Sequence, residues 1–357
     1  MQERIRTILE AAILAPSGDN CQPWRFAVGE NQIDLYDDPA ADTSYYNYRQ
    51  RASLVAHGAL LENIAIVAPS LGCNAGMELF PAKDRPDCVA RITLAECPPT
   101  PNELVPCLAR RITNRRRYQG GGLDAAQLAA LSPAAGDLPE VSIFLTSQRQ
   151  ELERLAEVIC LSDRLVFENR RLHSFLFEHI RWTDEEADRC RDGLDIKTLE
   201  LSAVDALAFK LLKNWGLANF LGKLGATRAV ADNARKLARS ASAIGVILGR
   251  SREPRTYLQG GRLLQRTWLQ ATRLGLSFHP MAGICFLMQR VAEGDAGELV
   301  PRHVRLIEAA LGEVAMVTGE PAPNVISLFR VGVAAAPGRR SQRKDLAQRL
   351  VGIAGEP

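Results

Sequence analysis

The sequence lacks the markers of several common protein classes. Its 357 residues include eight cysteines, but none forms a C-x-x-C pair or has a histidine partner at zinc spacing. We therefore expect reduced, mostly buried thiols and no metal site. Neither a G-x-G-x-x-G turn nor a Walker motif occurs, so the usual nucleotide-binding fingerprints are excluded. No G-x-S-x-G motif or nucleophile–base pair stands out, and the sequence assigns no catalytic residue.

Signals for membranes and nucleic acids are also weak. The first residues, MQERIRTILEAAILAP, mix charges with helically spaced apolar residues, unlike a signal peptide. The longest apolar window, residues 54–72, is interrupted by His57, Glu62 and Asn63. A net charge of +3 creates no global field that would require nucleic acid or an anionic membrane as a partner. We therefore expect a cytoplasmic protein with no membrane and no nucleic-acid partner.

Two parts of the chain resemble each other. GALLENIAIVAPSLG (58–72) and GRLLQRTWLQATRLG (261–275) share a glycine, a Leu-Leu pair, a central alanine and a terminal Leu-Gly in one register. Both read as amphipathic helices ending at a glycine, although two leucine-rich helices could coincide by chance. A second match aligns ILEAAILAPSGDNCQPWRFAV with LAALSPAAGDLPEVSIFLT. In the second copy the polar turn is replaced by Pro133, Ala134, Ala135 and Gly136.

These matches predict an α+β protein made of two related sheet-plus-helix units. The first unit would cover residues 1–105 and the second residues 106–357, joined at the proline-rich CPPTPNELVP. Within the second unit, about residues 151–231 read as an almost wholly helical insertion. That insertion could be a lid over a site or a plain elaboration of the core.

Two polar motifs could carry chemistry. APSGDNCQPWRF (15–26) places a polar turn before a strand, and ARRITNRRRY (109–118) contains an R-x-T-x-R pattern. Arginine forks and an interleaved hydroxyl suit the oxygens of a terminal phosphate. The alternatives are a capped turn for the first motif, and a solvated basic turn or a nucleic-acid patch for the second. A lone histidine on a helix is more often structural than a metal ligand.

Together with the G-x-L-L helix that runs into LGLSFHPMAG, these motifs resemble the nitroreductase-like FMN flavoproteins. That family pairs an R-x-[ST]-x-R segment, which binds phosphate, with a P-S-x-x-N-x-Q-P-W turn, usually from two subunits of a homodimer. Here the first unit lacks the arginine segment and the second lacks the polar turn. The resemblance is therefore to the single-chain branch, in which two fused units form a pseudo-dimer.

The resemblance implies an FMN-dependent oxidoreductase acting on a small conjugated or aromatic substrate, with NADH or NADPH as a possible reductant. It would be a monomer imitating a dimer, or a homodimer of such chains. The implied cofactor contacts are Pro16, Ser17, Asn20, Gln22, Arg111, Thr113, Arg115, Asn233, Lys236, Met281, Gly283 and Arg343. The expected substrate contacts are Tyr45, Tyr46, Tyr48, His179 and Trp182. Two alternatives remain: a protein that sequesters flavin with little turnover, and a flavin oxidase that converts an alcohol to an aldehyde in a natural-product pathway.

Overall fold

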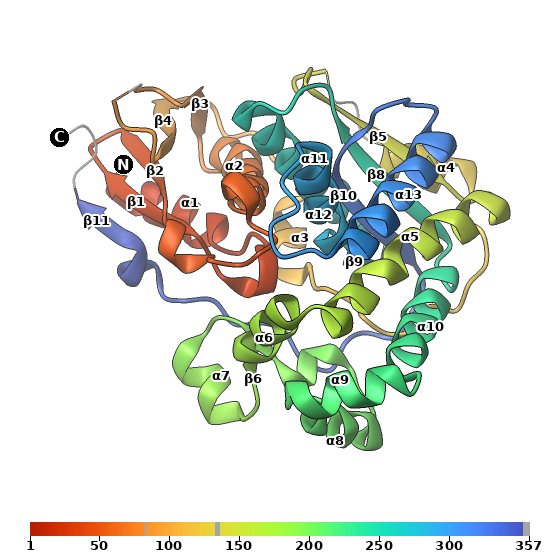
Figure 1. Ribbon diagram of the computed structural model, residues 1–357. Coiled ribbons are helices and arrows are strands. Elements are labelled where there is room, and N and C mark those ends of the chain that lie inside the picture. Colours follow the sequence, from red (N-terminus) through yellow and green to blue (C-terminus); the bar gives the residue numbers. More distant parts are fainter. Residues whose placement is uncertain (83, 133–135, 353–357) are drawn as a thin grey trace.

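A computed structural model describes residues 1–82, 84–132 and 136–352, and it contains two main β-sheets (Figure 1). The first sheet has the strand order β11-β1-β2-β4-β3, and the second has the order β5-β8-β10-β9. Helices pack around both sheets, so the predicted α+β class is confirmed. The strands of the two sheets are β1 Trp24–Val28, β2 Gln32–Asp37, β3 Cys73–Leu79, β4 Cys88–Glu96, β11 Leu350–Gly352, β5 Val141–Thr146, β8 Ala243–Gly249, β9 Ser277–Pro280 and β10 Asn324–Gly332.

Four strands of each sheet follow the same plan. When β1, β2, β4 and β3 are set against β5, β8, β10 and β9, every neighbouring pair is antiparallel in both sheets. In each sheet a long helix leads from the second strand of the set to the fourth: α2 (Arg51–Ser70) lies between β2 and β3, and α11 (Pro254–Arg273) lies between β8 and β9. These are the two helices that match in sequence. Gly72 and Gly275, which follow them, have positive φ angles of 74° and 72°, as a left-handed cap requires.

Helices α2 and α11 cross at two glycines. A Cβ atom on Gly58 would lie 2.0 Å from the carbonyl oxygen of Leu258, and one on Gly261 would lie 2.0 Å from that of Val55. Gly58 and Gly261 are equivalent in the sequence match, and Val55 and Leu258 each lie three residues before them. The crossing is therefore self-complementary, as contacts across a two-fold axis are.

The core surrounds this helix pair. The segment Tyr48–Ser70 is long and apolar enough to cross a membrane, but 89% of its most apolar window is buried inside the protein. We therefore assign it as the central core helix. Trp24 of β1 is fully buried. The rings of Trp268, Phe278 and Phe329 form a stack with centroid distances of 4.9 and 4.6 Å.

The two sheets differ in their connections. Three residues, 29–31, join β1 to β2, whereas six helices and a small two-stranded sheet separate β5 from β8. Figure 1 shows α6, α7, α8 and α9 gathered at one end of the molecule. The inserted elements are α5 Arg149–Glu168, α6 Arg170–His179, β6 Ile180–Arg181, α7 Asp184–Cys190, β7 Leu194–Asp195, η4 Ile196–Leu199, α8 Ala203–Leu211, α9 Trp215–Lys223 and α10 Ala226–Arg239.

The remaining elements connect or flank the sheets. Helices α12 and α13 separate β9 from β10, an insertion that the sequence patterns did not reveal. After β10 the chain returns to the first sheet, where β11 pairs with β1 in parallel. Residues 133–135 of the second, non-polar turn lie outside the described residues. The other elements are α1 Gln2–Ala12, η1 Gly18–Asn20, η2 Pro39–Ala41, η3 Tyr48–Gln50, α3 Val105–Arg110, α4 Ala125–Leu131, α12 Gly283–Ala292, α13 Pro301–Thr318 and η5 Leu346–Arg349.

Candidate functional site

A cavity of about 340 Å³ is lined by segments from both halves of the chain. Its volume lies within the range of small-molecule sites, roughly 300–1,000 Å³. The polar turn 16–19 and helix α2 form one part of its wall, and residues 113–115, α11 and residues 280–286 form another. Helices α5 and α6 of the insertion complete it.

The polar turn has an unusual backbone. Asp19, Asn20 and Gln22 have φ angles of 43°, 57° and 55°, a left-handed conformation that non-glycine residues seldom adopt. The Ser17 hydroxyl oxygen accepts a hydrogen bond from the Gln22 N–H at 2.9 Å, which helps to hold the turn. Pro16, Ser17 and Asp19 line the cavity. Burial raises the pKa of Asp19, and the nearby imidazole of His179 opposes that rise.

The side chains of Asn20 and Gln22, which are predicted to contact a cofactor, do not line the cavity and form hydrogen bonds within the protein. The Asn20 amide donates to the Gln342 carbonyl at 2.9 Å, and its oxygen accepts from Arg343 at 2.8 Å. The Gln22 amide donates to a backbone carbonyl of the insertion at 2.8 Å, and its oxygen accepts from the Lys344 N–H at 2.9 Å. Both side chains therefore position the C-terminal tail.

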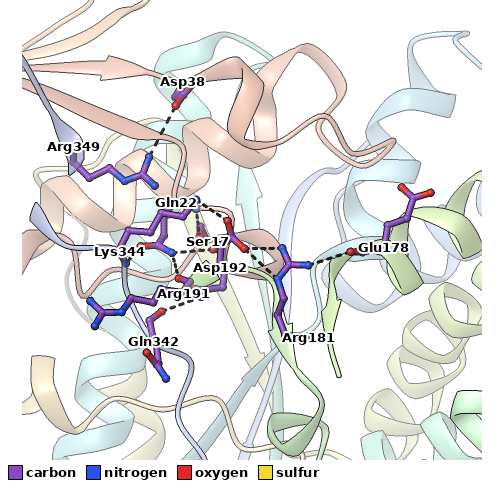
Figure 2. Close-up of polar contacts among 11 residues, drawn as sticks. Ser17, Gln22, Asp38, Glu178, Arg181, Arg191, Asp192, Gln342, Lys344 and Arg349 are labelled. Atoms are coloured by element: carbon purple, nitrogen blue, oxygen red, sulfur yellow. Dashed lines mark hydrogen bonds and ion pairs between the residues drawn. The ribbon is translucent and has the colours of Figure 1, made fainter. Parts of the chain in front are cut away.

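The C-terminal tail is held by a polar network (Figure 2). The Lys344 ammonium lies 2.6 Å from one carboxylate oxygen of Asp192. The other carboxylate oxygen of Asp192 accepts a hydrogen bond from Arg181 at 2.6 Å. Arg191 pairs with Asp345 at 2.5 Å. Figure 2 shows the Asp192 contacts together with those of Gln22, which join the polar turn to the segment after α7 and to the tail.

The arginine motif runs along the second sheet. Thr113 forms a parallel bridge with Phe278 of β9, so the motif is extended at this point. In an extended segment, residues two apart share one side, which places Arg111, Thr113 and Arg115 on a common side. All three line a small pocket of about 50 Å³, and Thr113 and Arg115 also line the larger cavity. The small pocket is therefore adjacent to the cavity.

The small pocket is strongly basic. Arg339, Arg340 and Arg343 of the tail line it together with the arginine motif. Arg339 pairs with Asp195 at 2.7 Å. Within the described part of the chain, the other four arginines of the pocket have no ion pair, and their hydrogen bonds go mainly to backbone carbonyls. These four are Arg111, Arg115, Arg340 and Arg343.

The unpaired arginines repel one another, and Arg111 at their centre is buried. Burial, together with the positive charges of Arg343 and Arg340, holds the pKa of Arg111 well below its usual value. Burial likewise lowers the pKa of Arg343 to about 10. The Arg111 guanidinium lies 4.3 Å from the ring centroid of Trp268, and its Nε is buried without a hydrogen-bond partner in the described structure. Because buried unpaired charges are costly, this pocket is complementary to an anion.

The insertion supplies cavity residues that the sequence analysis missed. Ser162 and Asp163 come from α5, and Phe175 and Leu176 from α6. Burial raises the pKa of Asp163 to about 6. Among the described residues, no hydrogen bond or ion pair is found for this carboxyl group. Helical periodicity indicated that α5 has a buried face, but it gave no sign that this face would meet the polar turn of the other half.

Gly283 lies where the cavity wall is tight. A Cβ atom at this position would be 2.8 Å from the Ser162 hydroxyl oxygen and 3.5 Å from the Tyr46 ring. Gly283 and Tyr46 both line the cavity, as do Pro280 and Ala282. Met281 does not: its N–H donates to the Leu328 carbonyl at 2.7 Å, and its side chain packs with the core of the second sheet.

Of the three tyrosines predicted to contact a substrate, only Tyr46 lines the cavity. The Tyr45 hydroxyl donates to the Ala296 carbonyl at 2.7 Å, and the Arg290 guanidinium lies 4.1 Å from its ring centroid. The Tyr48 ring lies against several arginines instead of facing the cavity. Tyr46 is thus the one of the three that the structure places at the cavity, and the substrate contacts stay predictions.

His179 and Trp182 also fall outside the cavity lining. The His179 imidazole stacks on Phe175 at a centroid distance of 3.9 Å, and its Nδ1 lies 2.8 Å from the Phe175 carbonyl oxygen. The Trp182 ring stacks on Phe177 at 6.2 Å. Both side chains pack against α6, and the substrate contacts predicted at these two positions stay predictions.

The predicted contacts at Asn233 and Lys236 are not supported either. Helix α10 begins at Ala226, so Asn233 does not start a helix. The buried face of α10 consists of small residues such as Ala231, Ala234 and Ala238, and the periodicity leaves Asn233 and Lys236 exposed. Neither residue lines the cavity or the arginine pocket.

No protein-family model matches the chain. An uncharacterized protein of Mycobacterium tuberculosis is 26% identical over 79% of this chain and 39% of its own length. A protein of the same species named "Putative NAD(P)H nitroreductase acg" is 22% identical, over 92% of this chain and 89% of its own length. The chain thus spans well under half of the first relative. Among solved structures, a nitroreductase from Anabaena variabilis, described as putative, matches 93% of this chain and 88% of its own, with 12% identity and a TM-score of 0.48.

Proposed function

We propose that this chain, which is similar to a protein named a putative NAD(P)H nitroreductase, is an FMN-dependent oxidoreductase acting on a small conjugated or aromatic substrate. NADH or NADPH would serve as the reductant. The observation that carries this proposal is the group of arginines without carboxylate partners, with Arg111 buried and Arg115 and Arg343 half-buried, beside a cavity to which both halves of the chain contribute. An anionic group joined to a flat, largely apolar ring system has the chemistry that such a pair of pockets accommodates.

The residues present fit FMN. Arg111, Arg115 and Arg343 offer charged donors to a phosphate, and Thr113 adds a hydroxyl between the pocket and the cavity. The Nε of Arg111, buried without a partner in the described structure, is a donor that a phosphate oxygen would satisfy. Trp268 and Leu264 of α11 give the cavity apolar surface on which a ring system can pack.

When bound, FMN supplies hydride or electron transfer to a substrate. The chain's own residues bind, orient and exclude water. The arginine pocket fixes one end of the ligand, and the polar turn and residues 280–283 bound the ring space. Phe175 and Leu176 close the insertion side with apolar surface. Asp163 holds a proton at its carboxyl group at slightly acidic pH, on the side that the insertion contributes.

We also propose that residues 1–105 and 106–357 are two units that together imitate a dimer and form one site. The shared strand order and the self-complementary crossing of α2 and α11 support this division. The polar turn comes from the first unit and the arginine motif from the second, so each unit holds half of the site. The tail complicates the boundary, because β11 of the second unit pairs with β1 of the first.

The deciding experiment is FMN reconstitution of the purified chain, followed by anaerobic reduction. We expect close to one FMN per chain by absorbance, bleaching of the flavin by NADH or NADPH, and recovery of the colour with a quinone. Two flavins per chain would contradict the single shared site. A chain that takes up no FMN would overturn the proposed function. A bound flavin that only dithionite reduces would leave a flavoprotein without the proposed reductant.

A further inference from the structure

The exposed apolar side chains of this protein are concentrated on one helical hairpin. Among the described residues, twelve large hydrophobic side chains are exposed, and seven of them lie between positions 201 and 224. Val204 is 77% exposed and Leu224 is 71% exposed. We call the seven residues the hairpin patch, since they lie on and beside α8 and α9: Leu201, Val204, Leu207, Leu211, Leu217, Phe220 and Leu224.

The hairpin patch is not the inner face of a poorly packed segment. Other side chains anchor the hairpin: Phe209 packs on Phe177 at a centroid distance of 4.9 Å, and Trp215 meets His173 at 5.1 Å. The His173 Nε2 lies 2.8 Å from the Leu212 carbonyl oxygen. Both helices begin at capping side chains, Ser202 for α8 and Asn214 for α9. The hairpin therefore has one face that packs inward and another that is apolar and exposed.

Basic residues accompany the hairpin patch. Between positions 201 and 228 the chain has four basic residues and a single acidic one, Asp205. Within the described structure none of the four basic residues forms an ion pair. Lys213 contacts the Trp182 ring at 5.6 Å, and the other three offer their charges to solvent. The basic residues are Lys210, Lys213, Lys223 and Arg228.

We propose that this hairpin docks the protein on an anionic lipid membrane. Short amphipathic helices with leucine and phenylalanine on one side and lysines around them lie in the membrane interface, where apolar burial and attraction to anionic headgroups act together. A second copy of this chain fits the patch less well, because pairing would bring the unpaired basic residues of both copies together. The expectation of no membrane partner rested on the modest net charge of the whole chain. That net charge does not reveal this local cluster of basic residues.

The test is vesicle co-sedimentation of the full chain, with phosphatidylcholine vesicles compared against vesicles that also contain phosphatidylglycerol. We expect binding to the anionic vesicles, and weaker binding in high salt because salt screens the lysines. Replacing Lys210, Lys213 and Lys223 by Gln should weaken binding about fivefold per residue. The apolar variant Val204→Ser/Leu207→Ser/Phe220→Ser should abolish it.

A matched control replaces exposed apolar residues outside the hairpin, Met316→Ser and Val333→Ser, which should leave vesicle binding unchanged. Circular dichroism melting checks that every variant is folded. No binding by the wild-type chain, or equal binding to both vesicle types, would overturn the proposal. So would a concentration-dependent dimer in light scattering that the apolar variant abolishes, since the patch would then cover a second copy. None of these outcomes depends on FMN, so the proposed oxidoreductase function is tested separately.

Discussion

The two sheets share a strand plan but differ in what their connections do. Three residues join β1 to β2, while the equivalent connection between β5 and β8 carries six helices, two of which line the cavity. The first half instead contributes a polar turn with three left-handed residues. A repeated scaffold therefore does not require a repeated site: each half adds different loops to the same strands, and these loops meet at one cavity.

The largest expected effect follows from removing the phosphate contacts that the second half of the chain contributes. Arg111→Ala/Arg115→Ala should weaken FMN binding by about 3–6 kcal/mol, since each charge-assisted hydrogen bond contributes roughly 1.5–3 kcal/mol. Riboflavin, which has no phosphate, should bind almost equally to both proteins. Fluorescence titration with the two ligands measures the difference. The exposed neighbour Arg117→Ala is the control and should change neither affinity. Equal losses for FMN and riboflavin would mean that these arginines act through folding.

A second prediction concerns the crossing of α2 and α11, to which both halves of the chain contribute in the same way. Gly58→Ala and Gly261→Ala each place a methyl group 2.0 Å from a backbone carbonyl oxygen of the opposite helix, so α2 and α11 must separate. Overpacking of this kind costs about 1–3 kcal/mol or more of unfolding free energy. The two variants should be similarly destabilised in urea unfolding. Gly312→Ala, in open space on α13, should instead stabilise by about 0.5–1 kcal/mol. A large difference between Gly58→Ala and Gly261→Ala would contradict the self-complementary crossing.

A third prediction concerns the pH dependence of stability that Asp163 of the insertion should cause. The folded pKa of Asp163, about 6, exceeds its usual value of 3.8 because the group is buried. Below pH 3.8 the carboxyl is protonated in both the folded and unfolded states and costs nothing. As pH rises from 3.8 to about 6, the unfolded state loses this proton while the folded state keeps it, so stability falls, with an upper bound of about 3 kcal/mol at 1.36 kcal/mol per pKa unit.

Asp163→Asn should therefore gain stability relative to wild type as pH rises from about 4 to 7. Urea unfolding of both proteins across this range measures the difference, which cancels the titration of the other groups. Ser162→Ala, at the adjacent position of the same cavity wall, is the control and should show no pH-dependent difference. A constant gap between wild type and Asp163→Asn would show that this carboxyl does not titrate as described.

The sequence predicted those features that depend on residues close together in the chain. The helix repeat identified α2 and α11, and the R-x-T-x-R pattern identified three residues that line one pocket. It failed where tertiary contacts decide a side chain's direction. Adjacent tyrosines in an irregular segment point to different surroundings, so Tyr46 lines the cavity while Tyr45 is held by Ala296. Asp163 was missed because a polar residue on a helix gives no signal until the opposite wall is known.

The smallest expected effect concerns the first half's turn. Asn20 holds the tail at two points, by donating to the Gln342 carbonyl and by accepting from Arg343. Asn20→Ala removes these contacts without touching the cavity, so FMN affinity should fall by only about 1 kcal/mol, through a less well positioned Arg343. Because the side chain does not face the cavity, the visible spectrum of bound flavin should not shift. Riboflavin affinity should be unchanged, since only the arginine pocket is affected.

Ser17→Ala is the matched comparison, because Ser17 does line the cavity and its loss should affect both ligands alike. A shifted flavin spectrum in Asn20→Ala would show that this amide reaches the ring after all, and that the turn contributes to the site directly instead of through the tail.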